Sequence, residues 1–273
     1  MAKIISILNF KGGVGKSTTA VNVAKALHMD GNRVLVIDAD PQGNASRMMG
    51  VKPTGIMNDK KESENGFTLY EAMMGKRLVE ECLCVDQEDD NSFHFIPANS
   101  LLSDLEEDLI KQIARERVMS GILERISPNY DYILIDCPPN DGLIAQNAMS
   151  ASDYILVPVN GEIFAIDGLS KILNRYDEIR RKINPKLRVL GFVFTLTQKN
   201  SLHRDIKEYL KQIHSNEGWP GFVFDTEIKR SIILAKAAAA STNIFDYSPY
   251  EPSAFAYRRL AKEIMEKIEL CKE

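Results

Sequence analysis

Residues 10–18 combine residue types that can hold the phosphate groups of a nucleotide, in the order Phe-Lys-Gly-Gly-Val-Gly-Lys-Ser-Thr. Glycine lets the backbone curl so that its N–H groups point at an anion. Lys16 can reach a β- and a γ-phosphate, and the Ser17 hydroxyl can bind Mg²⁺. We therefore expect a phosphate-binding loop. Its expected residues are Lys11, Gly12, Gly13, Val14, Gly15, Lys16, Ser17 and Thr18.

The segments on either side of this loop have the order that phosphate binding requires. The apolar run 4–8 predicts a strand, and the apolar spacing over 16–29 predicts a helix. That helix would direct its positive N-terminal end at the bound anion. One position departs from the usual G-x-x-x-x-G-K-[ST] pattern, because Phe10 replaces the first glycine. An additional lysine, Lys11, lies inside the loop.

Two further polar segments follow predicted buried strands. Asp-Ala-Asp-Pro-Gln-Gly-Asn occupies 38–44, and Asp-Cys-Pro-Pro occupies 136–139 with the layout of a Walker B motif. Parallel sheets bind ligands at the carboxyl ends of their strands. Asp38 and Asp136 could hold Mg²⁺ directly or through water, and Asp40 could orient an attacking water. Such residues also suit ordinary turns, but three such segments in this order are more specific than any one alone.

The composition is that of a globular protein with reduced cysteines. The 273 residues are 44% hydrophobic and 26% charged, enough for one large α/β domain or two small ones. Four cysteines at these spacings suggest neither a disulfide framework nor a metal site. There is no signal-peptide layout and no apolar run of membrane-spanning length, so we expect a cytoplasmic protein. A net charge of −4 argues against a wholly basic nucleic-acid binder but allows a local basic face.

Strands and helices alternate along the chain, which predicts an α/β fold: a doubly wound, mainly parallel sheet with helices on both faces. We expect one P-loop domain over 1–273, with a polar insertion around 50–66 and an acidic turn at 86–91. The predicted strands are 4–8, 33–38, 93–97, 130–136, 154–159, 189–195 and 222–226. The predicted helices are 16–29, one long or broken helix over 101–126, 143–149, 165–183, 202–214, 231–240 and 254–270.

Taken together, the segments 11–18, 38–44 and 136–139 resemble those of the ParA/Soj family of DNA-partitioning ATPases, which carry a deviant Walker A loop and belong to the ParA/MinD superfamily. The likeness extends to the tail over 247–261. It covers nearly the whole chain, although 50–95 matches only loosely. The resemblance implies a P-loop NTPase fold and ATP and Mg²⁺ as cofactors.

The resemblance also implies roles for single residues. Lys16 would bind the β- and γ-phosphates, and Thr18 the α-phosphate. Ser17, with Asp38 and Asp136, would serve the Mg²⁺ site. Asp40 would position the attacking water. Lys11 would reach the ATP of a partner subunit in a homodimer bridged by ATP, where positive charge accelerates phosphoryl transfer.

One departure concerns the adenine pocket. Where the family often has Ile-Pro-Arg-Asn, residues 228–231 read Ile-Lys-Arg-Ser. Lys229 and Ser231 could still contact the base through backbone and hydroxyl groups. The preference for ATP over GTP therefore stays open.

The resemblance implies binding to DNA without sequence readout, which would weaken steeply with salt. It also implies a ParB-like centromere-binding partner that stimulates slow hydrolysis, and association with the nucleoid. Because the chain begins almost at the loop, we expect no sequence-specific operator binding. The candidate DNA contacts are Lys199, Arg204, Lys229, Arg230 and Lys236. Further basic candidates are Arg258, Arg259 and the cluster 180–182.

Other functions within the superfamily remain alternatives. A MinD-like protein would end in a basic amphipathic membrane helix. Here the last predicted helix also carries Glu263, Glu266 and Glu269, which favours packing on the domain and no membrane contact. A cargo-positioning relative, or a nucleotide-gated scaffold with little turnover, also stays open. A shared iron–sulfur cluster is not expected, because only Cys137 lies beside the nucleotide motifs.

Overall fold

The computed structural model describes residues 1–50, 67–84, 93–161, 165–198, 201–217 and 220–271. Its centre is a seven-stranded sheet in the order β3-β2-β4-β1-β5-β6-β7, and every neighbouring pair is parallel. The predicted fold class is thereby confirmed. The strands are β1 (Lys3–Ile7), β2 (Val34–Asp38), β3 (His94–Ile96), β4 (Tyr132–Asp136), β5 (Tyr154–Asn160), β6 (Arg188–Thr197) and β7 (Phe222–Lys229).

The central strands are apolar because helices cover both of their faces. All residues of β2 and β5 are buried, including the polar ends Asp38 and Asn160. Strands buried on both sides need continuous hydrophobic runs rather than alternation. The same burial makes any polar group at a strand end costly unless it has a structural or functional use.

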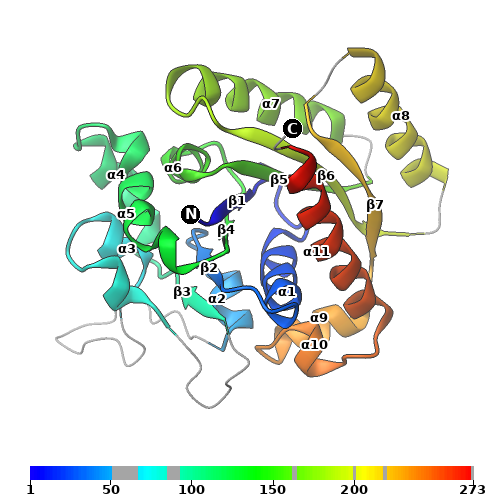
Figure 1. The fold of residues 1–273 in the computed structure, drawn as a ribbon, viewed down its shortest axis with the longest axis horizontal. Coiled ribbons are helices and arrows are strands. Elements are labelled where there is room, and N and C mark those ends of the chain that lie inside the picture. Colours follow the sequence, from blue (N-terminus) through cyan, green and yellow to red (C-terminus); the bar gives the residue numbers. More distant parts are fainter. Residues whose placement is uncertain (51–66, 85–92, 162–164, 199–200, 218–219, 272–273) are drawn as a thin grey trace.

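The helices form one layer on each face of the sheet (Figure 1). Apolar residues of α1 and α11 contribute to the core on one face of the sheet, and apolar residues of α4 to α7 contribute to the core on the other face. The first layer contains α1 (Lys16–Met29), α2 (Asn44–Met48), α9 (Ile232–Ala239), α10 (Ile244–Tyr247) and α11 (Pro252–Leu270). The second contains α3 (Leu69–Met73), α4 (Leu102–Ile110), α5 (Val118–Ile126), α6 (Leu143–Ala151), α7 (Ala165–Lys182) and α8 (Ser201–Glu217).

The predicted helix over 101–126 is broken into α4 and α5. The chain turns at Ala114, which adopts a positive φ of 54°, a conformation that ends an α-helix. The short helices α2, α3 and α10 were not predicted, although Thr68 and Glu71 carry a readable capping signature. There, Glu71 accepts hydrogen bonds from the backbone N–H and the hydroxyl of Thr68. The insertion around 50–66 and the acidic turn at 86–91 lie outside the described residues.

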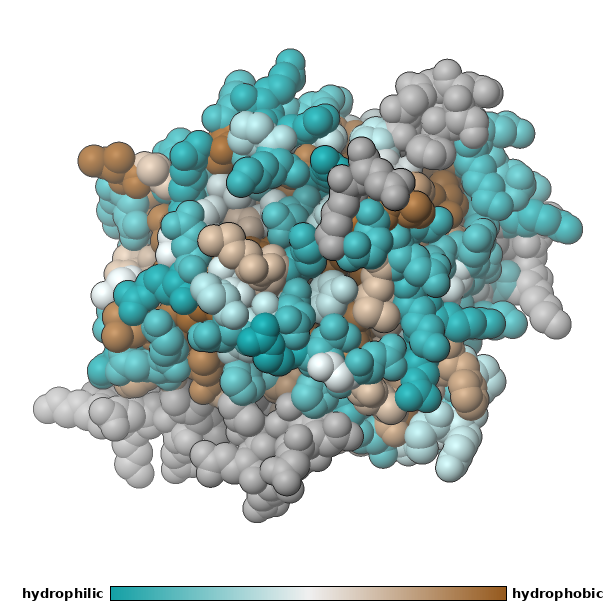
Figure 2. Space-filling view, in the orientation of Figure 1, coloured by the Kyte–Doolittle hydropathy of each residue, from teal (hydrophilic) through white to brown (hydrophobic). Residues whose placement is uncertain are grey.

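The last helix packs on the protein, as its sequence predicts. Tyr257, Leu260, Ile264 and Ile268 on α11 are buried in the core that α1 also joins. In Figure 2, hydrophilic side chains predominate on the face in which α11 lies in Figure 1. Among the described helices, none has the length and apolar character that crossing a membrane requires.

Side chains contact the backbone of β7, the last strand of the sheet. The two carboxylate oxygens of Glu263 on α11 accept hydrogen bonds from the N–H groups of Asp225 and Thr226, at 2.8 and 3.1 Å. Lys207 on α8 donates to the carbonyl oxygen of Asp225 and pairs with Glu227 at 2.8 Å. Helices on both sides thus hold this edge strand by its backbone.

Candidate nucleotide-binding site

The three motifs found in the sequence meet at one edge of the sheet. Strand β4 lies between β2 and β1, and Asp136 is the register partner of both Asp38 and Ile7. The loops that follow these strands therefore begin side by side. The phosphate-binding loop, the segment 38–44 and the segment 136–139 share the carboxyl edge, where parallel sheets bind ligands.

The loop between β1 and α1 has the backbone shape that an anion-binding loop needs. Gly13 and Gly15 adopt positive φ values of 73° and 82°, which other residues rarely tolerate. Asn9 holds the start of the loop: its amide donates to the Pro158 carbonyl oxygen at 2.7 Å, and its Oδ1 accepts the Lys11 N–H at 2.9 Å. Asn9 is a site residue that the sequence analysis missed.

A second missed residue, Thr195 on β6, holds the far side of the loop. Its hydroxyl donates to the carbonyl oxygen of Val14 at 2.7 Å and is buried. A Cβ atom at Gly15 would lie 3.8 Å from the Cβ of Thr195. The loop is thus held by hydrogen bonds at both ends before any ligand binds. No local sequence signal links Thr195 to a loop that lies 181 residues away.

Lys16 lies within this loop rather than in solvent. Its side chain is buried, and its Nζ donates to the Lys11 carbonyl oxygen at 3.1 Å. Burial lowers the pKa of Lys16, while the neighbouring Asp136, Cys137 and Asp40 oppose that shift. A buried ammonium group among carboxylates, inside a loop of backbone N–H groups, suits the binding of phosphate.

Asp136 carries a buried carboxylate at this edge of the sheet. It is fully buried, and neither carboxylate oxygen has a hydrogen-bond partner among the described residues. Burial and the nearby Asp38 raise its pKa well above the usual range, while Ser17 and Lys16 oppose the shift. The Ser17 hydroxyl thus lies close enough to Asp136 to affect its pKa. Unpaired carboxylate oxygens beside a hydroxyl are suitable ligands for a hard divalent cation.

Asp38, by contrast, is used to fasten the loop that carries Asp40. Its carboxylate accepts the N–H and the hydroxyl of Ser46, both at 2.7 Å, and the N–H of Asp40 at 3.1 Å. Burial raises the pKa of Asp38 to about 6 despite these hydrogen bonds. Asp40 is buried, and its Oδ1 accepts the N–H of Gln42 at 2.9 Å. Ser46, the third missed residue, is given by no motif.

A cavity of about 310 Å³ lies beside Asp40. The segments after β2 and β4 form two of its walls, and the first turns of α4 and α6 close the others. The lining residues are Asp40, Pro41, Gln42, Leu102, Ser103, Glu106, Pro138, Pro139, Asn140 and Ile144. The cavity therefore offers space for a small reactant next to a buried carboxylate.

The remaining predicted residues that the structure describes lie on β7, α8 and α9 or directly beside them. Lys229 ends β7 and is exposed, and Arg230 follows it. The Ser231 hydroxyl caps α9 by accepting two backbone N–H groups, and it donates to Glu251. Lys236 on α9 and Arg204 on α8 are exposed. Lys199 lies outside the described residues.

The half-buried Ser17 and Thr18 lie in the first turn of α1, whose N–H groups are available to an anion. Among the residues that the structure describes, no group of three or more His, Cys, Asp or Glu side chains forms a metal site. A P-loop cation does not need one, because a hydroxyl, a single carboxylate and phosphate oxygens hold it. Ser17 and Asp136 fit that donor set.

This strand–loop–helix arrangement with a buried aspartate on the neighbouring strand defines a P-loop nucleotide-binding protein. A family model described as an AAA domain matches residues 2–189. The sporulation initiation inhibitor protein Soj of Bacillus subtilis (strain 168) is 35% identical over 97% of this chain and 98% of its own. The chromosome partitioning protein ParA of Caulobacter vibrioides (strain NA1000 / CB15N) is 33% identical over 97% and 94%. The chain therefore belongs to the ParA/Soj-type family of ATPases.

A solved structure supports the same fold. The crystal structure of cobyrinic acid a,c-diamide synthase from Mycobacterium smegmatis, with bound ADP and magnesium, matches with a TM-score of 0.81. It is 25% identical, and the match covers 98% of this chain and 96% of the other. The similarity thus extends over the whole sheet, including the edge that carries the three motifs.

Proposed function

We propose that this protein is a Mg²⁺-dependent ATPase that dimerises around ATP, binds DNA without reading its sequence, and segregates a plasmid or chromosome. The observation that carries the proposal is the convergence of Lys16, Asp40 and Asp136 at one sheet edge. We further propose that residues 1–273 act as one ATPase domain, associated with the nucleoid in the cytoplasm. The family relationship to Soj and ParA supports this assignment.

For nucleotide binding, the backbone N–H groups of Gly12 to Thr18 would surround the phosphates, with Lys16 on the β- and γ-phosphates. Ser17 and Asp136 would hold Mg²⁺, which neutralises charge that develops on the phosphate oxygens. The backbone shape of the loop and the unpaired oxygens of Asp136 support these roles. Lys229 and the Ser231 segment would lie near the base. The Ser231 hydroxyl already caps α9, so a base contact there would come from backbone groups.

For hydrolysis, Asp40 would hold a water in line with the γ-phosphorus from the side of the cavity. The water oxygen bonds to phosphorus, the bond to the β,γ-bridging oxygen breaks with its electron pair left on ADP, and the water proton passes to the phosphate product or to solvent. Asp38 keeps Asp40 in place through the Asp40 N–H. Lys11 would complete the site of the partner copy, so that turnover requires two chains. We propose that turnover is slow until a ParB-like partner stimulates it.

For DNA binding, the proposed contacts are basic residues that are exposed where the structure describes them. Lys229 and Arg230 follow β7 at the carboxyl edge, the same edge that carries the phosphate-binding loop. A dimer bridged by ATP at that edge would set the basic residues of two copies at a fixed spacing. ATP would then control DNA binding by favouring the dimer, as in any population shift.

The test is cosedimentation of the Asp40→Ala variant with nonspecific DNA and, in parallel, with anionic liposomes, each with ATP or ADP. We expect retention on DNA only with ATP, and less of it as salt rises. Lys16→Ala serves as the control that does not bind nucleotide. Retention on liposomes would instead indicate a MinD-like protein. Retention on neither would indicate a switch that acts on a protein scaffold, as in cargo positioning.

A further inference from the structure

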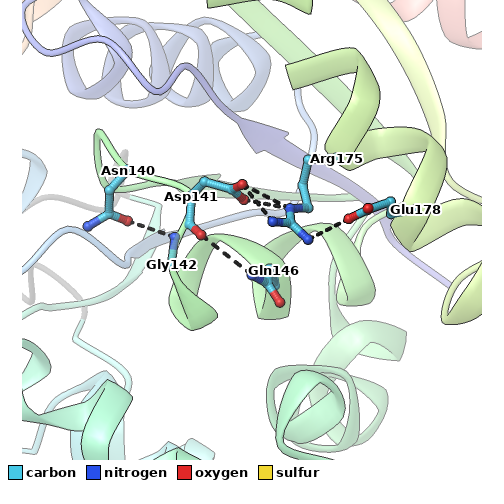
Figure 3. Close-up of polar contacts among 6 residues, drawn as sticks. All are labelled: Asn140, Asp141, Gly142, Gln146, Arg175 and Glu178. Atoms are coloured by element: carbon cyan, nitrogen blue, oxygen red, sulfur yellow. Dashed lines mark hydrogen bonds and ion pairs between the residues drawn. The ribbon is translucent and has the colours of Figure 1, made fainter. Parts of the chain in front are cut away.

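The loop that follows Asp136 is tied to α7 by an ion pair outside the nucleotide motifs. The Arg175 guanidinium donates from Nε to Oδ1 of Asp141 and from Nη2 to Oδ2, both at 2.8 Å. Figure 3 shows this two-point contact between the helix and the loop. Arg175 also donates from Nη1 to Glu178 at 2.6 Å, which orients the guanidinium from its own helix. Two parallel hydrogen bonds fix the direction of a carboxylate as well as its distance.

The rest of the loop is held by further hydrogen bonds and by close packing. The Asn140 side-chain oxygen accepts the Gly142 N–H at 3.1 Å, and Gln146 of α6 donates to the Asp141 carbonyl oxygen at 3.5 Å (Figure 3). Glu106 of α4 lies directly over Gly142, where a Cβ atom would come within 1.9 Å of its Oε1. Asn140, Asp141 and Gly142 are thus each in contact with a neighbour in the loop, on α4 or on α6.

This loop forms one wall of the cavity beside Asp40. Pro138, Pro139 and Asn140 line the cavity, whereas the next residue, Asp141, contacts α7. The segment that begins at Asp40 forms another wall. The contact between Arg175 and Asp141 thus holds the residue next to the cavity lining, while neither of the two residues lines the cavity itself.

We propose that Arg175 is a positioning residue for ATP turnover. Through Asp141 it holds the loop 138–142 against α7, and so sets the position of the cavity wall that faces the water held by Asp40. This inference rests on the proposed function, since it concerns the same reaction. It predicts that the ion pair affects the chemical step and leaves nucleotide binding unchanged, because Lys16, Ser17 and Asp136 do not contact it.

The experiment compares Arg175→Ala, Asp141→Ala and the double variant with the wild type. Single-turnover hydrolysis is measured at saturating protein, and the Kd of a fluorescent ATP analogue is measured separately. We expect each single variant to slow hydrolysis about threefold to tenfold with an unchanged Kd for the analogue. Because Arg175 and Asp141 are in direct contact, the effects of the two substitutions should not add. The double variant should be no slower than the slower single one. The exchanged pair Arg175→Asp with Asp141→Arg should recover part of the rate, since opposite charges would again face each other between the loop and α7.

Lys171→Ala is the matched control, because Lys171 is an exposed basic residue on the same helix and belongs to neither the proposed nucleotide site nor the candidate DNA contacts. It should hydrolyse ATP at the wild-type rate. Rates are normalised to the fraction that binds nucleotide, so that partial unfolding does not count as slow chemistry. Wild-type rates in Arg175→Ala, additive losses in the double variant, or an equal weakening of Kd would overturn the inference. Absent hydrolysis in the wild type would contradict the proposed function instead.

Discussion

Asp38 and Asp136 are register partners on the neighbouring strands β2 and β4, and these two buried carboxylates differ in the hydrogen bonds that they accept. Asp38 accepts three hydrogen bonds, whereas the oxygens of Asp136 accept none from the described residues. Asp38 thus acts as a structural anchor for the loop that carries Asp40. Asp136 remains available to a ligand, and the folded protein carries the cost of its burial until one binds.

Asp136→Asn should stabilise the protein in the absence of nucleotide and Mg²⁺. The folded state raises the pKa of Asp136 above its unfolded value, so its contribution to stability is present at low pH and lost as pH rises through the folded pKa. The amide of the Asp136→Asn variant does not ionise, so the variant does not lose this stability as pH rises. We expect a higher free energy of unfolding at pH 8, by an amount on the order of 1 kcal/mol or more, and no gain near pH 4. Urea denaturation of both proteins across this pH range measures it. If the free energies of unfolding of the variant and the wild type differed by the same amount at every pH, the buried charge of Asp136 would not be the cause of the difference.

Thr195→Val should weaken nucleotide binding without unfolding the protein. The substitution keeps the shape of the side chain and removes the hydrogen bond that holds the Val14 carbonyl oxygen. The loss of one such bond costs about 1 kcal/mol, which corresponds to about a fivefold higher Kd. Titration with a fluorescent ATP analogue checks this, with Thr197→Val, two residues further along β6, as the control. Equal affinities of the Thr195 variant and wild type would show that the loop needs no support from β6.

Lys11→Ala should separate nucleotide binding from dimerisation. The Lys11 backbone holds the loop through Asn9 and Lys16, and an alanine keeps both of these backbone contacts. The variant should therefore bind ATP but stay monomeric, whereas Lys16→Ala should lose ATP binding altogether. Light scattering with a non-hydrolysable ATP analogue distinguishes the two. An ATP-bound dimer of Lys11→Ala would exclude a role for Lys11 across the interface.

Gly191→Ala should strongly destabilise the sheet. A Cβ atom there would lie 2.2 Å from the Phe222 carbonyl oxygen and 2.8 Å from the Phe224 ring, so the backbone of β7 would have to move. We expect a loss of about 2 to 4 kcal/mol. Gly121→Ala on α5 is the matched control, because no atom lies within 4 Å of its added Cβ. That change should stabilise by about 0.5 to 1 kcal/mol. Denaturation curves of both variants decide this, and similar effects would refute the steric argument.

The sequence was sufficient for the sheet and for the motif residues because both depend on local patterns. Continuous apolar runs predicted each strand of the sheet to within a few residues. Because each motif follows a predicted parallel strand, the sequence also predicted that Lys16, Asp40 and Asp136 lie at the same edge of the sheet. A parallel sheet leaves little freedom here, since consecutive strands must return to the same edge.

The supporting residues could not be predicted because their partners are distant in the chain or generic in type. Thr195 lies 181 residues from Val14, and Arg175 lies 34 from Asp141. The hydroxyl of Ser46 is indistinguishable in sequence from that of any other serine. Ser231 looked like a base contact, yet its hydroxyl is used by the N-terminus of α9, which only the three-dimensional arrangement reveals.

The backbone contacts on β7 have a consequence for how chains can associate. An open strand at the end of a sheet is a template onto which another chain can add its own strand. Glu263 and Lys207 occupy the N–H groups of Asp225 and Thr226 and the carbonyl oxygen of Asp225. This part of the edge is thereby protected against strand addition, so copies of the chain would have to associate through other surfaces.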